Sequence, residues 1–257
     1  MRPVRFALPL MIAFLAAHTH AQTSPRHTAD GFHTWISYTG DHKVSKHWGI
    51  HLEAVLRRAD FLSTPQQFMP RVAINYHFSP RIFVALGYAF VDTYPYGEFP
   101  VKATFPEHRI YEQLQGRSNE GRFEIVQRLR LEQRWNHLPV QQPSSDYAPG
   151  PAVYSNRVRY LLRFSVPFKG KTIEDHSWYA TVSNEAFVNF GKHVLYNIFD
   201  QNRAYAAIGY KLPKVGRLEV GYLNQHLFKG NGTQVENNHT LSIGLSSSVD
   251  FMRKPKQ

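Results

Sequence analysis

Two stretches, Arg122-Phe-Glu-Ile-Val-Gln-Arg-Leu-Arg-Leu-Glu-Gln-Arg134 and Arg157-Val-Arg-Tyr-Leu-Leu-Arg-Phe-Ser-Val-Pro-Phe168, alternate between charged or polar and apolar side chains. Successive side chains of a β-strand point to opposite faces, so each stretch predicts a strand with one apolar and one charged face. In a soluble sandwich the charged face would meet water. In an outer-membrane barrel the charged face would line the lumen and the apolar face would meet lipid.

The first residues have the pattern of a secretory signal peptide. Arg2 and Arg5 precede an apolar run from Phe6 to Ala17, and the small residue Ala21 offers a cleavage point. We therefore expect a signal peptide at residues 1–21, followed by a short polar leader at 22–31. No run after residue 21 approaches the ~20 apolar residues that a spanning helix needs. A membrane-embedded mature chain must then be a closed barrel, which also satisfies its backbone in lipid.

The chain is basic, with 30 Lys and Arg against 19 Asp and Glu and a formal charge of +11. Clustered cations would indicate nucleic acid, but these are spread singly along an exported chain, so we expect no nucleic-acid partner. There is no cysteine, and core packing and strand pairing must hold the fold without disulfides. No His-Glu-x-x-His motif occurs either, so we expect no metal and no cofactor.

Eleven segments alternate in this way and are separated by residues typical of turns. They are residues 32–39, 47–57, 71–78, 81–91, 107–114, 122–135, 157–168, 178–190, 199–212, 217–228 and 239–251. The connections 79–81, 116–121 and 213–216 are short, whereas 92–106, 136–156 and 229–238 are long, as on the two sides of an outer-membrane barrel. Aromatic residues lie near the segment ends, where such a barrel has its girdles.

The strand number follows from a parity argument. Single-chain bacterial barrels have even numbers of strands. We therefore expect an all-β, antiparallel transmembrane barrel of about twelve strands over residues 32–251. Ten strands are the alternative if the segment around residues 23–46 is atypical. Residues 252–257 form a basic tail.

A series of short motifs follows the same order as in a known bacterial family. The first half has Trp35, Tyr38-Thr-Gly40, Trp48-Gly-Ile-His-Leu-Glu53, Gly87-Tyr-Ala-Phe90, Glu107-His-Arg-Ile110 and Arg128-Leu-Arg-Leu-Glu-Gln-Arg134. The second has Arg157-Val-Arg-Tyr160, Asn184-Glu-Ala-Phe187, Asp200-Gln-Asn-Arg203 and Glu219-Val-Gly-Tyr-Leu-Asn-Gln225. The series resembles the family called Domain of Unknown Function 2490. This resemblance implies an exported outer-membrane β-barrel and supplies no activity, cofactor or catalytic residue.

The charged faces of the predicted strands would meet inside such a barrel. The expected lumen residues are Glu53, Arg57, Arg71, Glu107, Arg109, Arg128, Arg130, Glu132, Arg134, Arg157, Arg159, Arg163, Glu185, Arg203 and Glu219. Arginine pairs well with carboxylate, so these residues predict an Arg–Glu network that fills the lumen. Arginines outnumber glutamates in this set, and the surplus would suit binding or passage of an anion.

Three functional hypotheses are consistent with these features of the sequence. The leading one is an outer-membrane barrel with a structural role or passive passage of small solutes or anions. The alternatives are a soluble exported β-barrel or sandwich that binds a ligand, and an outer-membrane lipid hydrolase. The His-Ser-Asn-Gly-type signature of the outer-membrane phospholipase is absent, so we expect no enzyme. The expected partners are outer-membrane lipid and the barrel-assembly machinery.

Overall fold

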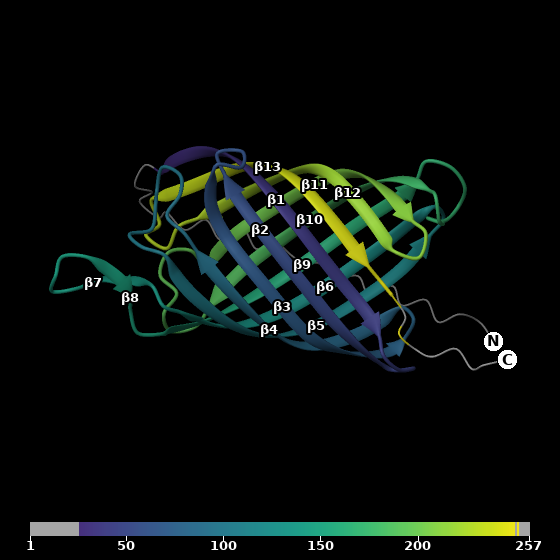
Figure 1. The fold of residues 1–257 in the computed structure, drawn as a ribbon, viewed down its shortest axis with the longest axis horizontal. Coiled ribbons are helices and arrows are strands. Elements are labelled where there is room, and N and C mark those ends of the chain that lie inside the picture. The colour runs from purple at the N-terminus through teal and green to yellow at the C-terminus, as the bar shows by residue number, and fades with distance from the viewer. Residues whose placement is uncertain (1–25, 250, 252–257) are drawn as a thin grey trace, which may run out of the picture.

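The computed structural model describes residues 26–249 and 251 as a single closed barrel (Figure 1). Its eleven strands are β1 (His27–Lys43), β2 (Trp48–Ala59), β3 (Thr64–Ser79), β4 (Ile82–Thr93), β5 (Phe105–Glu120), β6 (Phe123–Asn136), β9 (Val153–Pro167), β10 (Trp178–Phe190), β11 (Phe199–Leu212), β12 (Gly216–Phe228) and β13 (Gln234–Ser247). Two short strands, β7 (Pro139–Gln141) and β8 (Tyr147–Pro149), form a hairpin that projects from one end. The all-β barrel prediction is confirmed.

The barrel closes where β1 pairs with β13, and these two strands run parallel. All other neighbours in the barrel pair antiparallel. A meander reverses direction at every strand, so an odd number of strands leaves the first and last pointing the same way. The barrel therefore has eleven strands, as many as the alternating segments, and the parity argument that favoured twelve was wrong.

The first strand is longer than the sequence pattern indicated. β1 begins at His27, where its backbone N–H donates to the carbonyl of Thr233 at 2.8 Å. The second half of the expected leader is therefore strand. At the other end, the backbone N–H of Phe251 donates to the carbonyl of Lys43 at 2.9 Å. The predicted signal peptide and the basic tail lie outside the described residues.

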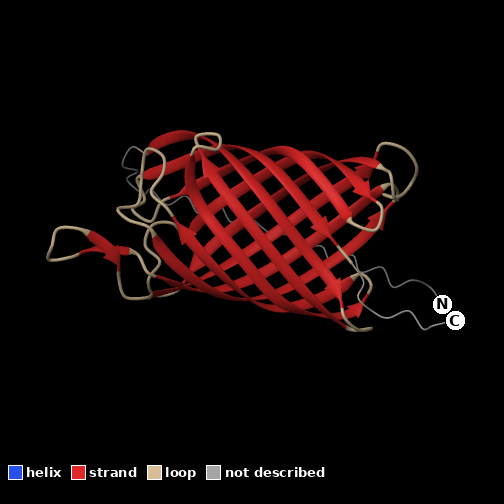
Figure 2. Ribbon diagram, viewed as in Figure 1, coloured by secondary structure: helices blue, strands red, loops and turns tan. Residues whose placement is uncertain are grey.

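The connections divide the barrel into two ends, seen at right and left in Figure 2. We call them the turn end, with connections 44–47, 80–81, 121–122, 168–177 and 213–215, and the loop end, with 60–63, 94–104, 137–152, 191–198 and 229–233. The short and long connections predicted from the sequence lie at these opposite ends. The one long connection at the turn end is 168–177.

The wall of the barrel is apolar outside and charged inside. On β10, for example, Val182 is 53% exposed on the outer wall, whereas Glu185 is 6% exposed inside. Aromatic pairs lie near both ends, with Trp48 against Tyr76 at the turn end, and Trp135 against Tyr154 at the loop end. Within residues 26–249 and 251, no helix is long and apolar enough to cross a membrane.

Candidate functional site

The fifteen charged residues predicted for the lumen all point into the barrel. They come from eight strands, and they are at most about a quarter exposed. The agreement follows from the period-two alternation of a strand, because one correctly placed residue fixes the face of its neighbours. Their contact with a solute stays a prediction.

Glu132 and Glu185 form the centre of the network. Glu132 accepts hydrogen bonds from Arg157 at 2.6 Å and from Arg159 at 2.7 Å. Glu185 accepts from Arg159 at 2.7 Å and from Arg128 at 2.8 Å. Glu132 and Arg157 face each other directly across β6 and β9, so strand register places the pair. Each carboxylate serves two guanidinium groups, which offsets the cost of burying its charge.

A second group of ion pairs lies toward the loop end. Glu107 accepts from Arg109 at 2.6 Å and from Arg134 at 2.5 Å. Asp200 accepts from Arg157 at 2.7 Å, which extends the central group toward the loop end. The interior thus holds clusters of several charges as well as single ion pairs.

Asp200 was missed in the sequence because a β-bulge interrupts its strand. Phe187 pairs with Gln201, but the next residue, Val188, pairs with Phe199, so Asp200 is an extra residue in β11. Strict alternation would point Asp200 outward, opposite to Gln201. The bulge turns both side chains inward, where they are 5% and 4% exposed. Glu124 and Arg217, by contrast, continue the alternation of Arg128 and Glu219, so the pattern contained them although the expected set did not.

Aromatic rings and amide groups accommodate part of the arginine surplus. Arg130 donates to Gln113 at 2.6 and 2.9 Å and lies 4.3 Å from the centre of the Tyr111 ring. Phe187 is fully buried, and its ring lies 4.6 Å from the guanidinium groups of both Arg159 and Arg203. Cation–π contacts of this kind are stronger away from water. These arginines are therefore packed against aromatic rings and amide groups of the interior.

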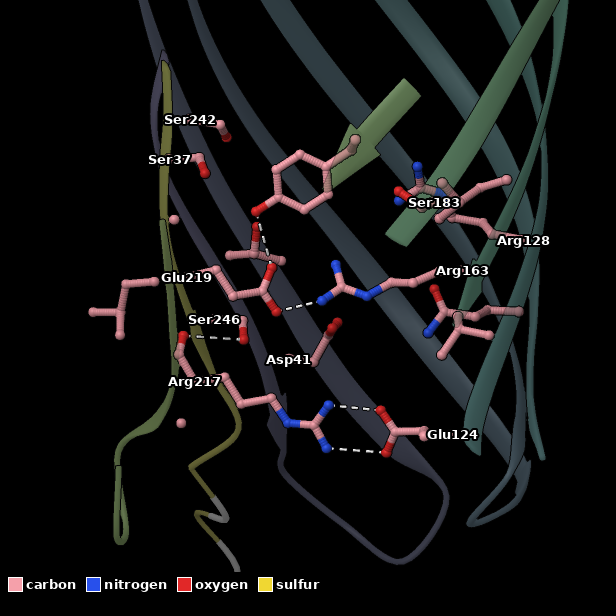
Figure 3. Close-up of a pocket in the computed structure, with 18 of the residues that line it drawn as sticks. Ser37, Asp41, Glu124, Arg128, Arg163, Ser183, Arg217, Glu219, Ser242 and Ser246 are labelled. Atoms are coloured by element: carbon pink, nitrogen blue, oxygen red, sulfur yellow. Dashed lines mark hydrogen bonds and ion pairs between the residues drawn. The ribbon is translucent and has the colours of Figure 1, made fainter. Parts of the chain in front are cut away.

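Several contacts cross the lumen from one wall to another. Arg163 on β9 pairs with Glu219 on β12 (Figure 3). Glu219 also accepts a hydrogen bond from Tyr179 at 2.6 Å. Arg217 on β12 donates two hydrogen bonds to Glu124 on β6, at 2.6 and 3.0 Å. Each of these two contacts joins strands that are separated by two or three other strands in the barrel. Both contacts border a cavity at the turn end, whereas the nearly fully buried Arg130, Glu132 and Phe187 fill the middle of the barrel.

The filled middle leaves a cavity at each end. The turn-end cavity has a volume of about 500 Å³ and contains the serines Ser37, Ser183 and Ser242 and the cations Arg128 and Arg163 (Figure 3). The loop-end cavity has a volume of about 240 Å³ and lies beneath the connection 94–104. Arg203 borders both cavities. Among the described residues, no group of three or more His, Cys, Asp or Glu is placed to hold a metal ion.

A side-chain contact holds the connection 94–104 across the opening of the barrel at the loop end. The hydroxyl of Tyr96 donates to Glu236 on β13 at 2.9 Å, and Lys229 reaches the same carboxylate at 2.5 Å. Burial raises the pKa of the Tyr96 hydroxyl above its ordinary value, so the group stays a donor at neutral pH. This connection thus forms a roof over the smaller cavity.

A comparison with known protein families identifies the chain at this point. The model of the family described as "Protein of unknown function (DUF2490)" matches residues 32–236. The chain belongs to the DUF2490 family. The predicted family is confirmed over most of the DUF2490 barrel, from β1 into β13. No curated protein and no solved structure matches this DUF2490 member.

Proposed function

We propose that this DUF2490 member is an outer-membrane β-barrel whose filled interior makes it a closed barrel and not an open diffusion pore. The distribution of polarity supports the membrane location most strongly. A soluble barrel would bury its apolar residues and expose its charges, whereas here large apolar side chains such as Ile74, Leu86 and Val182 are more than half exposed on the outer wall.

The dimensions and aromatic residues of the wall agree with this proposal. The barrel strands are 12 to 17 residues long, and a tilted transmembrane strand needs about 9–11. Aromatic pairs near both ends correspond to the girdles that lie at the two membrane interfaces. Outer-membrane lipid and the barrel-assembly machinery are then the partners of the chain.

The interior supports a closed state. Arg130 and Glu132 are each 1% exposed and Phe187 is fully buried. These three side chains are buried even though they face the lumen and the backbone leaves both ends of the barrel open. A water-filled channel would expose such side chains. The lumen charges would then act as a polar core that holds the walls together, with no catalytic role.

The test has two parts. Envelope membranes are separated by density, and the chain is followed by a tag placed in the exposed connection 168–177. It should band with the outer membrane and change its gel mobility on heating, whereas recovery as a soluble periplasmic protein would refute the membrane proposal.

The second part is single-channel recording of the refolded mature chain in a planar bilayer. We expect no stable openings. Anion-selective openings would instead support passive anion passage, which the arginine surplus favours. In that case Arg130→Ala and Arg159→Ala should shift the selectivity.

A further inference from the structure

The loop-end cavity has more positive charge than its carboxylates balance. Eight cationic side chains line it, against two carboxylates, Glu107 and Asp200. Four further carboxylates outside the lining lie within ion-pair distance of these cations: Glu53, Glu132, Glu185 and Glu236. Two positive charges remain without a carboxylate even when all six are counted.

Arg57 is the clearest of these surplus cations. Its side chain is 6% exposed, and among the described residues no carboxylate lies within 4.0 Å of it. Its Nη1 donates to Gln67 at 2.6 Å, and its guanidinium lies 3.8 Å from the ring centre of Trp35. Its Nε is buried with no hydrogen-bond partner in the part of the chain that the structure describes. A buried, unsatisfied donor on a charged group is costly.

Other guanidinium groups converge on the same place. Arg203 lies 5.0 Å from the same Trp35 ring, and its nearest carboxylate, on Glu185, is 3.8 Å away. Arg71 also has a buried Nε without a partner among the described residues. Arg71 and Arg109 both approach the sulfur of Met69, at 2.6 and 3.8 Å. Arg71 and Arg109 have carboxylate partners in Glu53 and Glu107. Arg57 has none, so the neighbouring guanidinium groups repel it unless an anion lies between them.

We propose that the loop-end cavity binds a divalent oxyanion of the size of phosphate or sulfate, with Arg57, Arg71 and Arg203 as its main ligands. Guanidinium donors match the geometry of such an anion. A charge of −2 would balance the surplus. The volume of about 240 Å³ admits a small anion with a few waters beneath the roof that includes Tyr96 and Phe99. This inference rests on the interior of the barrel and is independent of the membrane location.

The test is isothermal titration of the refolded mature chain in detergent micelles. Sodium phosphate and sodium sulfate are the probes, and sodium chloride at equal ionic strength is the reference. We expect one saturable site per chain for each oxyanion, with mutual competition. Arg57→Gln should weaken both at least about tenfold, which is the loss expected for charge-assisted hydrogen bonds. Arg117→Gln removes the same charge at the opposite end, where Arg117 is half exposed, and should leave the Kd unchanged.

A second measurement needs no variant. A ligand that binds only the folded state raises its stability, so sulfate should raise the unfolding temperature of the wild-type barrel more than chloride does at equal ionic strength. A phosphate-bearing lipid in the micelle that displaced sulfate would assign the oxyanion to a headgroup, and its failure to do so would assign it to a free anion. The proposal is overturned if neither oxyanion binds saturably below about 10 mM, or if Arg57→Gln and Arg117→Gln weaken binding equally.

Discussion

Arg217 on β12 and Glu124 on β6 face each other across the lumen and share two hydrogen bonds, at 2.6 and 3.0 Å. Arg117 also approaches Glu124, but only to 4.0 Å, and its side chain is half exposed. We predict that Arg217→Gln lowers the free energy of unfolding by about 1–3 kcal/mol, because a bidentate, part-buried pair is lost. Arg117→Gln should cost less than about 1 kcal/mol, as exposed pairs do.

Urea unfolding of the refolded barrel measures both variants, and Glu124→Gln completes a double-mutant cycle. The coupling free energy between Arg217 and Glu124 should exceed that between Arg117 and Glu124. Equal couplings would show that the bond across the lumen stabilises the barrel no more than the exposed pair does.

Phe187 fills the central layer, where its ring lies against the guanidinium groups of Arg157, Arg159 and Arg203. We predict that Phe187→Ala joins the two end cavities and produces single-channel openings that the wild type lacks. The lost packing should also lower the free energy of unfolding by about 3–5 kcal/mol. Phe190→Ala changes the same residue type on the outer wall of the same strand, where Phe190 is 43% exposed, and should stay silent. Wild-type openings as large as those of Phe187→Ala would contradict a seal at this layer.

Local alternation predicted the face of every charged residue in the expected lumen set, because a strand leaves only two choices. It could not place Asp200, since nothing in the sequence distinguishes a bulged residue from its neighbours. Phe187, by contrast, alternates with Glu185 and Asn189, so the same pattern implies an inward position. Its residue type alone would have suggested the outer wall.

The strand number depended on a different kind of information. The alternating segments numbered eleven, but the even-number rule for bacterial barrels favoured twelve. Whether β1 meets β13 parallel or antiparallel depends on a pairing between residues about 200 positions apart, and no local pattern records it. Local signals thus predicted the segments, and a general rule about barrels misled the count.

The outer wall gives a direct test of lipid exposure. Val182 is 53% exposed and lies between the aromatic residues Trp178 and Phe190, near the middle of β10. We predict that Val182→Arg lowers the free energy of unfolding in phospholipid vesicles by about 2–4 kcal/mol, the cost of arginine near the bilayer midplane. Thr172→Arg adds the same side chain in the exposed connection 168–177 and should change stability little. Similar small effects of both substitutions would indicate a wall that faces water.

The parallel closure can be tested with cysteine pairs, because the chain has no cysteine of its own. Ile36 on β1 lies directly opposite Ile243 on β13, and neighbouring strands bring such residues close enough for a disulfide. We predict that Ile36→Cys with Ile243→Cys forms a disulfide on mild oxidation of the folded barrel. Phe32→Cys with Ile243→Cys should not, because Phe32 lies opposite His239 in the parallel register.

The readout is gel mobility of the unfolded, non-reduced chain, since a disulfide between β1 and β13 closes a loop of almost the whole barrel and makes the denatured chain more compact. A barrel closed by an additional strand would separate β1 from β13 by about two strand spacings, roughly 10 Å. That distance is too long for a disulfide. Failure of the Ile36–Ile243 pair to oxidise in a barrel that still shows heat-modified mobility would therefore refute the eleven-strand closure.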